Sequence, residues 1–281
     1  MVLNYINWNI DPEIINVFGI SIRYYGIFFS TGLILSIYIL SWIYKRENIP
    51  SENLEKLSIY GMIGILAGAR LGHCLFYEAS YYLSNPIEMI LPITFLPDGG
   101  IKFIGYQGLA SHGGALGLII ALFFYSRKTK HPMIDTIDLI AVVAALSGGF
   151  IRLANLMNSE IIGTPTTKPR GFVFERIDNI PRHPAQLYEA ISYFLIFAIM
   201  IILYKTKRAK LKNGFFFGLA LVLIFTARFI LEFFKENQVG FENNLTFNMG
   251  QLLSLPYIFI GIGFVLFGLW KTKKAQRTTN L

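Results

Sequence analysis

The chain has 281 residues, of which 54% are hydrophobic and only 15% are charged. Soluble globular domains carry about 25% charged residues, so this composition argues against a soluble enzyme, a disordered chain and a coiled coil. The net charge of +8 is typical of basic loops beside a membrane and does not indicate a nucleic-acid partner. Cys74 is the single cysteine, which excludes an internal disulfide and a cysteine metal cluster.

Seven stretches are apolar and long enough to cross a bilayer, which takes about 20 helical residues. They cover residues 24–44, 57–77, 103–126, 137–159, 184–204, 213–234 and 248–270. Two further segments, 78–102 and 160–183, are rich in proline, glycine and polar residues and are expected to form small structures outside the bilayer. The start of the chain lacks the basic region of a cleavable signal peptide and contains Asp11 and Glu13. The sequence therefore predicts one all-α, multi-pass membrane domain over residues 1–281.

Basic residues in the loops predict the orientation of these helices, because short loops rich in Lys and Arg stay in the cytoplasm. The connections after the first, third, fifth and seventh spans hold most of them, as in the run from Lys205 to Lys212. We therefore expect the N-terminus outside the cytoplasm and the C-terminus inside it. Segment 160–183 is the exception, since it places four basic residues on the outer side. It can flank an anionic ligand or be an ordinary solvated loop.

In this orientation, the polar side chains of the spans gather in the outer half of the bilayer. A charged side chain within a span costs about 2.5–3.5 kcal/mol on insertion scales and usually marks a functional site. The inner halves of the helices are almost purely apolar, which argues against a channel or a proton relay. Arg70, Arg152 and Arg228 are expected to converge in a cavity open to the outer leaflet. Because a guanidinium group binds phosphate with two parallel hydrogen bonds, a phospholipid head group is the expected ligand.

Structural alternatives stay open at several of these positions. Arg228 and Glu232 are four residues apart on one helix and can neutralise each other. Arg70 can extend its side chain to the membrane interface. Asp138, at the start of the fourth span, is expected to cap its helix. A face of small residues on the second span predicts close helix packing and not a nucleotide loop; it consists of Gly61, Gly64, Gly68 and Gly72.

Four local strings contain most of the residues with chemical potential. The first, at 111–117, is a histidine followed by two glycines, which can let the backbone approach a ligand closely. The second, at 152–160, places Arg152, Asn155 and Asn158 on roughly one helix face, with Glu160 where the chain can turn. The third, at 183–189, starts a helix with a proline and carries Gln186, Tyr188 and Glu189. The fourth, at 228–234, joins Arg228 to Glu232.

Together and in this order, the strings resemble those of the prolipoprotein diacylglyceryl transferase family. The resemblance runs from Ile22–Gly26 to the Asn248–Gln251 opening of the last span, and the Arg-x-x-Asn-x-x-Asn-x-Glu string is specific beside the other three. Three positions depart from the family pattern. Ile151 and Ala154 stand where the family usually has glycine, and Ile224 stands where it often has tyrosine. These departures affect local packing and substrate positioning.

The resemblance implies an enzyme that transfers the sn-1,2-diacylglyceryl group of phosphatidylglycerol to the lipobox cysteine in the signal peptide of a prolipoprotein. A thioether forms and glycerol 1-phosphate is released, as the first step of bacterial lipoprotein maturation. It also implies a seven-helix protein of the bacterial inner membrane in contact with membrane lipids, without a metal, a cofactor or a nucleic-acid partner. Arg152 and Arg228 match the essential arginines of the family, and His112 matches its candidate base. The expected substrate-binding residues are Tyr25, Arg70, Asn155, Asn158, Glu160, Gln186, Tyr188, Glu189 and Glu232.

Two other classes of function compete with this interpretation. A transporter or lipid flippase should continue its polar residues inward along two or more helices, and the sequence lacks such a path. A lipid-binding protein without chemistry explains the arginines but not the combination of the His-Gly-Gly and Arg-x-x-Asn-x-x-Asn-x-Glu strings.

Overall fold

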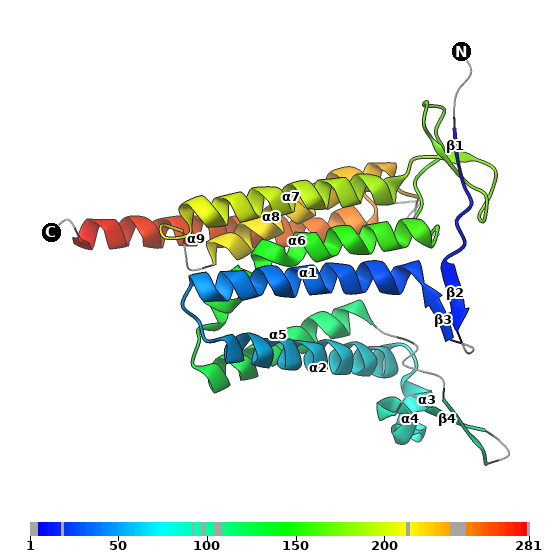
Figure 1. Cartoon of the computed structure of the whole chain (residues 1–281), viewed down its shortest axis with the longest axis horizontal. Helices are drawn as coiled ribbons and strands as arrows, with labels where there is room; N and C mark the ends of the chain where they lie inside the picture. Colours follow the sequence, from blue (N-terminus) through cyan, green and yellow to red (C-terminus); the bar gives the residue numbers. More distant parts are fainter. Residues whose placement is uncertain are drawn as a thin grey trace. The chain divides into compact units, whose positions relative to one another are not determined.

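The computed structural model describes residues 5–17, 20–91, 93–96, 99–103, 108, 110–211, 214–236 and 246–279. Long helices dominate this part of the chain (Figure 1). They are α1 (Tyr24–Arg46), α2 (Ser51–Phe76), α5 (Ser111–Thr129), α6 (Met133–Met157), α7 (Ala185–Lys207), α8 (Phe215–Leu231) and α9 (Met249–Thr279). A short 3₁₀ helix, η1 (Glu232–Phe234), continues α8.

Six of these helices are long and apolar enough to cross a membrane, namely α1, α2, α6, α7, α8 with η1, and α9. Large apolar side chains point outward from them; Ile34, Ile63 and Phe259 are 64%, 59% and 69% exposed. Such surfaces are unfavourable in water and suit a hydrocarbon surrounding, where helices satisfy their own backbone hydrogen bonds. The described residues therefore form a mainly helical, multi-pass membrane protein.

The helix α5 differs from the span predicted at 103–126. Strand β5 (Ile101–Phe103) covers the predicted start, and the helix begins only at Ser111. Residues 104–107 and 109 lie outside the described residues, and Gly108 between them has a positive φ of 70° that no helix continues through. Ser111 and His112 at one end and Arg127 and Lys128 at the other make α5 less apolar, and it is not among the six.

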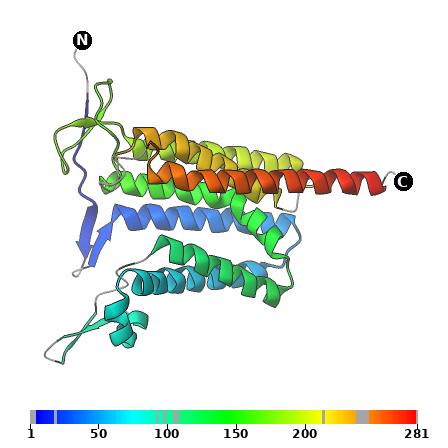
Figure 2. The same cartoon turned by 180° about the vertical axis from the view of Figure 1, so that it is seen from behind.

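Two compact units make up the chain, and each is described by itself. The first consists of Met1–Ile43 and Ile137–Leu281. In it, α6, α7, α8 and α9 run side by side (Figure 2). Glycines allow this close packing: a Cβ on Gly149 of α6 would lie 2.6 Å from the ring of Phe194 of α7, and one on Gly218 of α8 would lie 2.6 Å from the carbonyl oxygen of Gly261 of α9.

Asp138 joins three helices at one end of the first unit. Its carboxylate is fully buried and accepts hydrogen bonds from the backbone N–H groups of Gly214 and Phe217, both at 2.9 Å. Arg208, which follows α7, lies 3.4 Å from the same carboxylate. The expectation that Asp138 caps its own helix was wrong. It lies inside α6 and caps the N-terminus of α8, whose first N–H groups have no partner within their helix.

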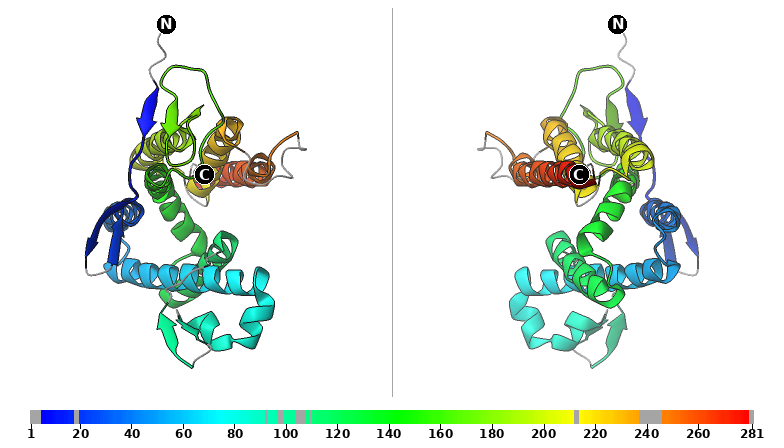
Figure 3. Two further views of the ribbon diagram at one scale, coloured as in Figure 1. Left: turned by 90° about the vertical axis from the view of Figure 1, so that its right-hand side faces the viewer. Right: turned by 90° about the vertical axis from the view of Figure 1, so that its left-hand side faces the viewer.

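A small sheet stands beyond the other end of these helices. Strand β1 (Ile6–Trp8) pairs in parallel with β6 (Phe172–Phe174), and β7 (Pro181–Arg182) pairs with β6 in antiparallel fashion (Figure 3). The indole N–H of Trp8 donates to the carbonyl of Leu156 at the end of α6, at 3.0 Å. A separate hairpin, β2 (Glu13–Val17) with β3 (Ile20–Arg23), leads into α1. The sheet therefore fixes segment 160–183 over the end of α6.

The second unit, Tyr44–Thr136, is built on the pair α2 and α5. A Cβ on Gly68 would lie 2.3 Å from the carbonyl oxygen of Gly113, and one on Gly64 would lie 2.6 Å from that of Gly117. The predicted packing role of the small-residue face on the second span is thus confirmed. The sequence also predicted that the glycine pair after His112 lets the backbone approach a ligand. This prediction does not hold for Gly113, because Gly113 packs against α2.

A short arm continues from α2 in this unit. It comprises α3 (Ala79–Ser84), α4 (Pro86–Ile90) and the hairpin of β4 (Ile93–Phe95) with β5. The predicted outer segment 78–102 covers these elements, apart from residues 92, 97 and 98, which lie outside the described residues.

Candidate active site

The end of α6 presents the signature string as a hydrogen-bonded chain of side chains. Arg152 donates from Nη1 to Oδ1 of Asn155 at 3.3 Å. Asn155 and Asn158 donate from their amide groups to Oε1 of Glu160, at 2.6 and 3.4 Å. The helical spacing of three residues places these side chains one above the other, as the sequence predicted. Glu160 is therefore held by two neutral amides and not by an arginine.

A sharp turn after α6 holds Glu160 in this position. Ser159 and Ile161, on either side of it, have positive φ angles of 54° and 57°. A β-branched residue rarely adopts this conformation, and such strain occurs mainly where surrounding contacts enforce it. Gln186, at the start of α7, donates from Nε2 to the carbonyl of Glu160 at 2.6 Å. The chain is thus folded back so that the Glu160 carboxylate meets the last turns of α6.

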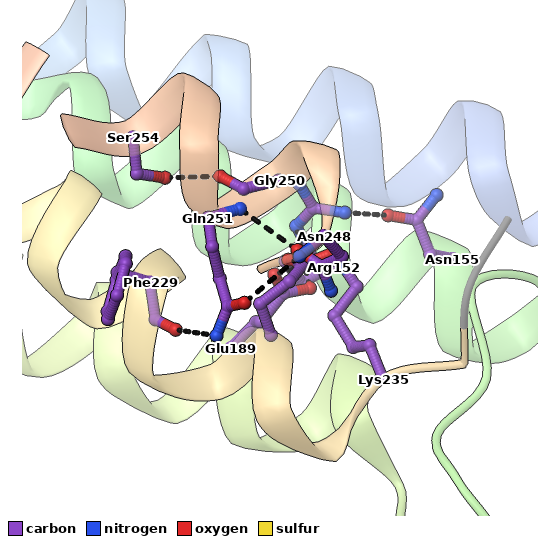
Figure 4. Close-up of polar contacts among 10 residues, drawn as sticks. Arg152, Asn155, Glu189, Phe229, Lys235, Asn248, Gly250, Gln251 and Ser254 are labelled. Carbon is purple, nitrogen blue, oxygen red and sulfur yellow. Dashed lines mark hydrogen bonds and ion pairs between the residues drawn. The ribbon is translucent and has the colours of Figure 1, made fainter. Parts of the chain in front are cut away.

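Glu189 of α7 lies at the centre of a buried charge network (Figure 4). Its carboxylate is 3.2 Å from Nε of Arg152 and 3.6 Å from Nζ of Lys235. Lys235 also forms an ion pair of 3.0 Å with Glu232 of η1. Three segments far apart in the sequence therefore contribute alternating charges to one cluster, which we call the charge network: Arg152, Glu189, Glu232 and Lys235.

The N-terminus of α9 closes one side of the charge network. Asn248 and Gln251 cap it reciprocally: each side-chain oxygen accepts the backbone N–H of the other residue, at 2.9 and 3.2 Å. Gln251 also donates to the carbonyl of Phe229 at 3.4 Å (Figure 4). Gly250 leaves room here for Glu232, since a Cβ on it would lie 2.5 Å from the carboxyl carbon and the Glu232 side chain would have to shift.

Arg228 stands beside the charge network without joining it. Tyr193 of α7 lies within electrostatic reach of Arg152, Glu189 and Arg228, which places both guanidinium groups in one neighbourhood. No hydrogen bond or ion pair links Arg228 to Glu232 among the described residues, because Glu232 pairs with Lys235. The alternative in which Arg228 and Glu232 neutralise each other is therefore wrong. Tyr25, at the start of α1, similarly lies within electrostatic reach of Arg152 and Glu160.

Unsatisfied polar atoms concentrate at this site. Within the described part of the chain, every buried side-chain nitrogen or oxygen without a hydrogen-bond partner belongs to six residues here: Arg152, Asn158, Ser159, Gln186, Glu189 and Arg228. The atoms of Arg152 and Glu189 are in ion pairs, so those of Asn158, Ser159, Gln186 and Arg228 are left with neither kind of partner. Native proteins leave few buried polar groups unpaired, because each costs about 1–3 kcal/mol. Among the atoms without any partner, Nε of Arg228 and the hydroxyl of Ser159 are donors, and they are the ones that could bind an anionic ligand.

Tyr188 belongs to an aromatic group at the edge of the site. Its ring lies 6.0 Å from that of His183 and 6.1 Å from that of Phe234, and its hydroxyl is 3.3 Å from Nδ1 of His183. These contacts place Tyr188 beside η1, whereas Gln186 and Glu189 on the same helix are buried toward α6.

Two predicted site residues belong to the second unit. His112 lies exposed in the first turn of α5. Arg70 of α2 is 4% exposed and donates to the carbonyls of Glu88 and Met89, at 2.7 and 3.2 Å. Its guanidinium also lies 4.8 Å from the ring centre of Tyr82. Arg70 thus anchors the arm to α2, with its guanidinium buried against protein carbonyls.

Lys235 and Gly250 are site residues that the sequence interpretation missed. The sequence assigns no role to Lys235, since no residue next to it in sequence reveals its burial. Its position three residues after Glu232, at the end of an apolar helix, was the only local signal.

No group of three or more His, Cys, Asp or Glu residues in the described ranges is placed to hold a metal ion.

The fold and the site define a multi-pass membrane protein with a buried network of alternating charges where several helices end. A model of the family described as prolipoprotein diacylglyceryl transferase matches residues 12–267. The chain belongs to this family of transferases.

Three relatives are each named phosphatidylglycerol–prolipoprotein diacylglyceryl transferase. That of Bacteroides fragilis is 57% identical over 93% of this chain and 95% of its own length. That of Tolumonas auensis is 44% identical over 92% and 96%, and that of Chloroherpeton thalassium is 39% identical over 98% of each chain.

Proposed function

We propose that this chain transfers the sn-1,2-diacylglyceryl group of phosphatidylglycerol to the lipobox cysteine of prolipoproteins, the first step of bacterial lipoprotein maturation. The thiol sulfur forms a bond to the terminal glyceryl carbon, the bond from that carbon to the phosphate oxygen breaks, and glycerol 1-phosphate leaves. The thiol proton passes to a base on the enzyme. The observation that carries this proposal is that the buried Nε of Arg228 has no hydrogen-bond or ion-pair partner among the described residues and lies in the neighbourhood of Arg152.

Arg152 and Arg228 bind the phosphate in this proposal. Negative charge grows on the leaving phosphate oxygen, and donors that are already oriented stabilise it without reorganisation. Glu189 and Asn155 hold the Arg152 side chain from two sides, at 3.2 and 3.3 Å. Tyr25, Asn158, Glu160, Gln186, Tyr188 and Glu232 complete the substrate-binding set, with Arg70 acting through the arm that it anchors.

His112 is the proposed base. A cysteine thiol has a pKa of about 8.5 and must lose its proton to attack carbon. If His112 accepts that proton, the His112→Gln variant should lose about 10²–10⁴ in rate, and raising the pH toward 8.5 should restore part of it. A mild loss that is equal at every pH would instead assign His112 to hydrogen bonding.

The protein is proposed to cross the bacterial inner membrane seven times, with α5 as the additional span. Its 19 residues extend over about 28 Å, close to the thickness of the hydrocarbon core. Its packing against α2 through glycine contacts supports this placement, since small residues bring membrane helices together. The N-terminus would then lie outside and the C-terminus in the cytoplasm.

A direct assay tests the function. Purified protein, phosphatidylglycerol vesicles and a synthetic lipobox peptide should yield a diacylglyceryl peptide in the mass spectrum, together with glycerol 1-phosphate. A peptide with serine in place of the lipobox cysteine is the matched control. Modification of the serine peptide, or equal product from phosphatidylethanolamine alone, would contradict the proposal.

A further inference from the structure

Lys235 is buried against two carboxylates at the edge of the site. It is 6% exposed, and its Nζ lies 3.0 Å from Oε2 of Glu232 and 3.6 Å from Oε1 of Glu189. A buried ammonium group is costly unless it is paired, so these two contacts account for its presence there.

The backbone around Lys235 is fixed by hydrogen bonds to the turn after α6. Lys235 forms an isolated β-bridge with Gly163. On either side of it, Thr164 donates to the carbonyl of Phe234 at 2.9 Å, and Glu236 donates to the carbonyl of Ile162 at 3.2 Å. The turn after α6 thus fixes the backbone of Lys235, and the two ion pairs hold its ammonium group between the carboxylates.

The ion pairs of Lys235 affect which guanidinium groups remain available to bind a phosphate. Glu232 has Lys235 as its ion-pair partner, and Arg228 on the same helix makes no ion pair within the described part of the chain. Glu189 divides its contacts between Lys235 and Arg152. Without Lys235, Glu189 would keep its ion pair with Arg152, and Glu232 would have Arg228 four residues earlier along the same helical segment as a cation to pair with. A carboxylate that takes a guanidinium fork competes directly with a phosphate for the same donors.

We propose that Lys235 is a positioning residue that pairs with Glu232 and so keeps the guanidinium group of Arg228 available to the phosphate of the lipid substrate, beside Arg152. This inference rests on the proposed function. It concerns the affinity for the anionic lipid and not the affinity for the peptide, because the peptide thiol carries no phosphate.

The test compares Lys235→Gln with Lys235→Arg. The Gln variant should raise KM for phosphatidylglycerol by roughly tenfold or more, the scale of one lost charge contact, while KM for the lipobox peptide stays unchanged. The Arg variant keeps the charge and should stay within a few-fold of the unaltered protein. Lys56→Gln is the matched control, since Lys56 forms only an exposed ion pair with Glu52 on α2.

Other outcomes overturn the inference. Equal changes in both KM values, or a Gln variant with unaltered KM for the lipid, would make Lys235 a purely structural residue. If Lys235→Gln does not fold, the double variant Lys235→Gln/Glu232→Gln decides: recovered folding supports the charge pairing, and no recovery contradicts it. Absence of any product from the unaltered protein would instead be a failure of the proposed function.

Discussion

Arg152 and Arg228 face the same site but are restrained differently. Arg152 is fixed by Glu189 and Asn155, whereas Arg228 has a buried Nε with no hydrogen-bond partner among the described residues. In Arg152→Lys and Arg228→Lys, an ammonium replaces a planar fork that can bind two phosphate oxygens. We expect each change to lower kcat/KM by about 10²–10³-fold, the usual loss when one oriented donor is removed.

Steady-state kinetics on purified variants with matched thermal unfolding curves would measure this loss. Arg70→Lys serves as the comparison, because Arg70 donates to the carbonyls of Glu88 and Met89 and should affect the arm more than turnover. Near-normal turnover in Arg152→Lys would contradict recognition of the phosphate by the guanidinium fork.

At this scale, the sequence predicted what lies within one helix and missed what depends on contacts between helices. The spacing of Arg152, Asn155 and Asn158 placed them correctly because a single helix sets it. The partner of Glu232 could not be predicted in the same way. Arg228 and Lys235 are both near it in sequence, and only the change from α8 to η1 and the bridge to Gly163 select Lys235.

Among the elements, α8 depends on a side chain from another helix for its N-terminal cap. Asp138→Ala would remove the acceptor of the N–H groups of Gly214, just before α8, and Phe217, in its first turn, and leave Arg208 buried without this carboxylate. Breaking a buried ion pair typically costs about 3–5 kcal/mol, so the midpoint of thermal unfolding in detergent should fall by several degrees. Asp135→Ala, one turn earlier on α6, should cost about 1 kcal/mol or less. An equal effect of both changes would argue against the cap.

The arm in the second unit should lose stability when the pH falls into the acid range. Glu88 accepts the backbone N–H of Phe95 at 2.8 Å and the hydroxyls of Tyr81 and Thr94 at 2.7 and 3.1 Å. These hydrogen bonds, led by the one from Phe95, lower the pKa of the Glu88 carboxyl below its ordinary value. The stabilisation is therefore complete above the unfolded pKa of about 4.3 and is lost as the pH falls through the lower folded value.

Hydrogen exchange of the amides in residues 86–96 would follow this transition. Exchange should be independent of pH near neutrality, after correction for the intrinsic rate, and should accelerate below about pH 4. Glu88→Gln should remove that acid transition and leave the arm less protected at neutral pH. An unchanged transition in the variant would assign it to other carboxyl groups.

At this scale, the presence of a helix was easier to predict than the residues at which it begins and ends. Long apolar runs predicted α1, α6 and α7 to within a few residues, because burial in lipid imposes one composition along the whole helix. The start of α5 was missed, since Gly108 and the strand pairing of Ile101–Phe103 with Ile93–Phe95 interrupt a run that is still apolar in composition. Composition alone does not distinguish an apolar strand from an apolar helical turn.

For the whole molecule, the direction of the helices relative to the membrane decides whether the function is possible. The charge network lies where α6 and α8 end and α7 and α9 begin, so all its residues share one side of the first unit. A prolipoprotein presents its cysteine after export begins, and the site must then face away from the cytoplasm. The distribution of Lys and Arg in the loops is the only feature of the sequence that predicts this direction.

Cysteine labelling tests that direction. In a Cys74→Ser background, Arg176→Cys places a thiol between β6 and β7, and Lys207→Cys places one at the end of α7; both positions are exposed. On intact cells with a permeable outer barrier, a membrane-impermeant maleimide should modify the thiol at 176 and not the one at 207. Both should react after lysis, which controls for reactivity. Labelling at 207 alone, or equally at both positions before lysis, would place the charge network on the cytoplasmic side or in mixed orientations and contradict the proposed reaction.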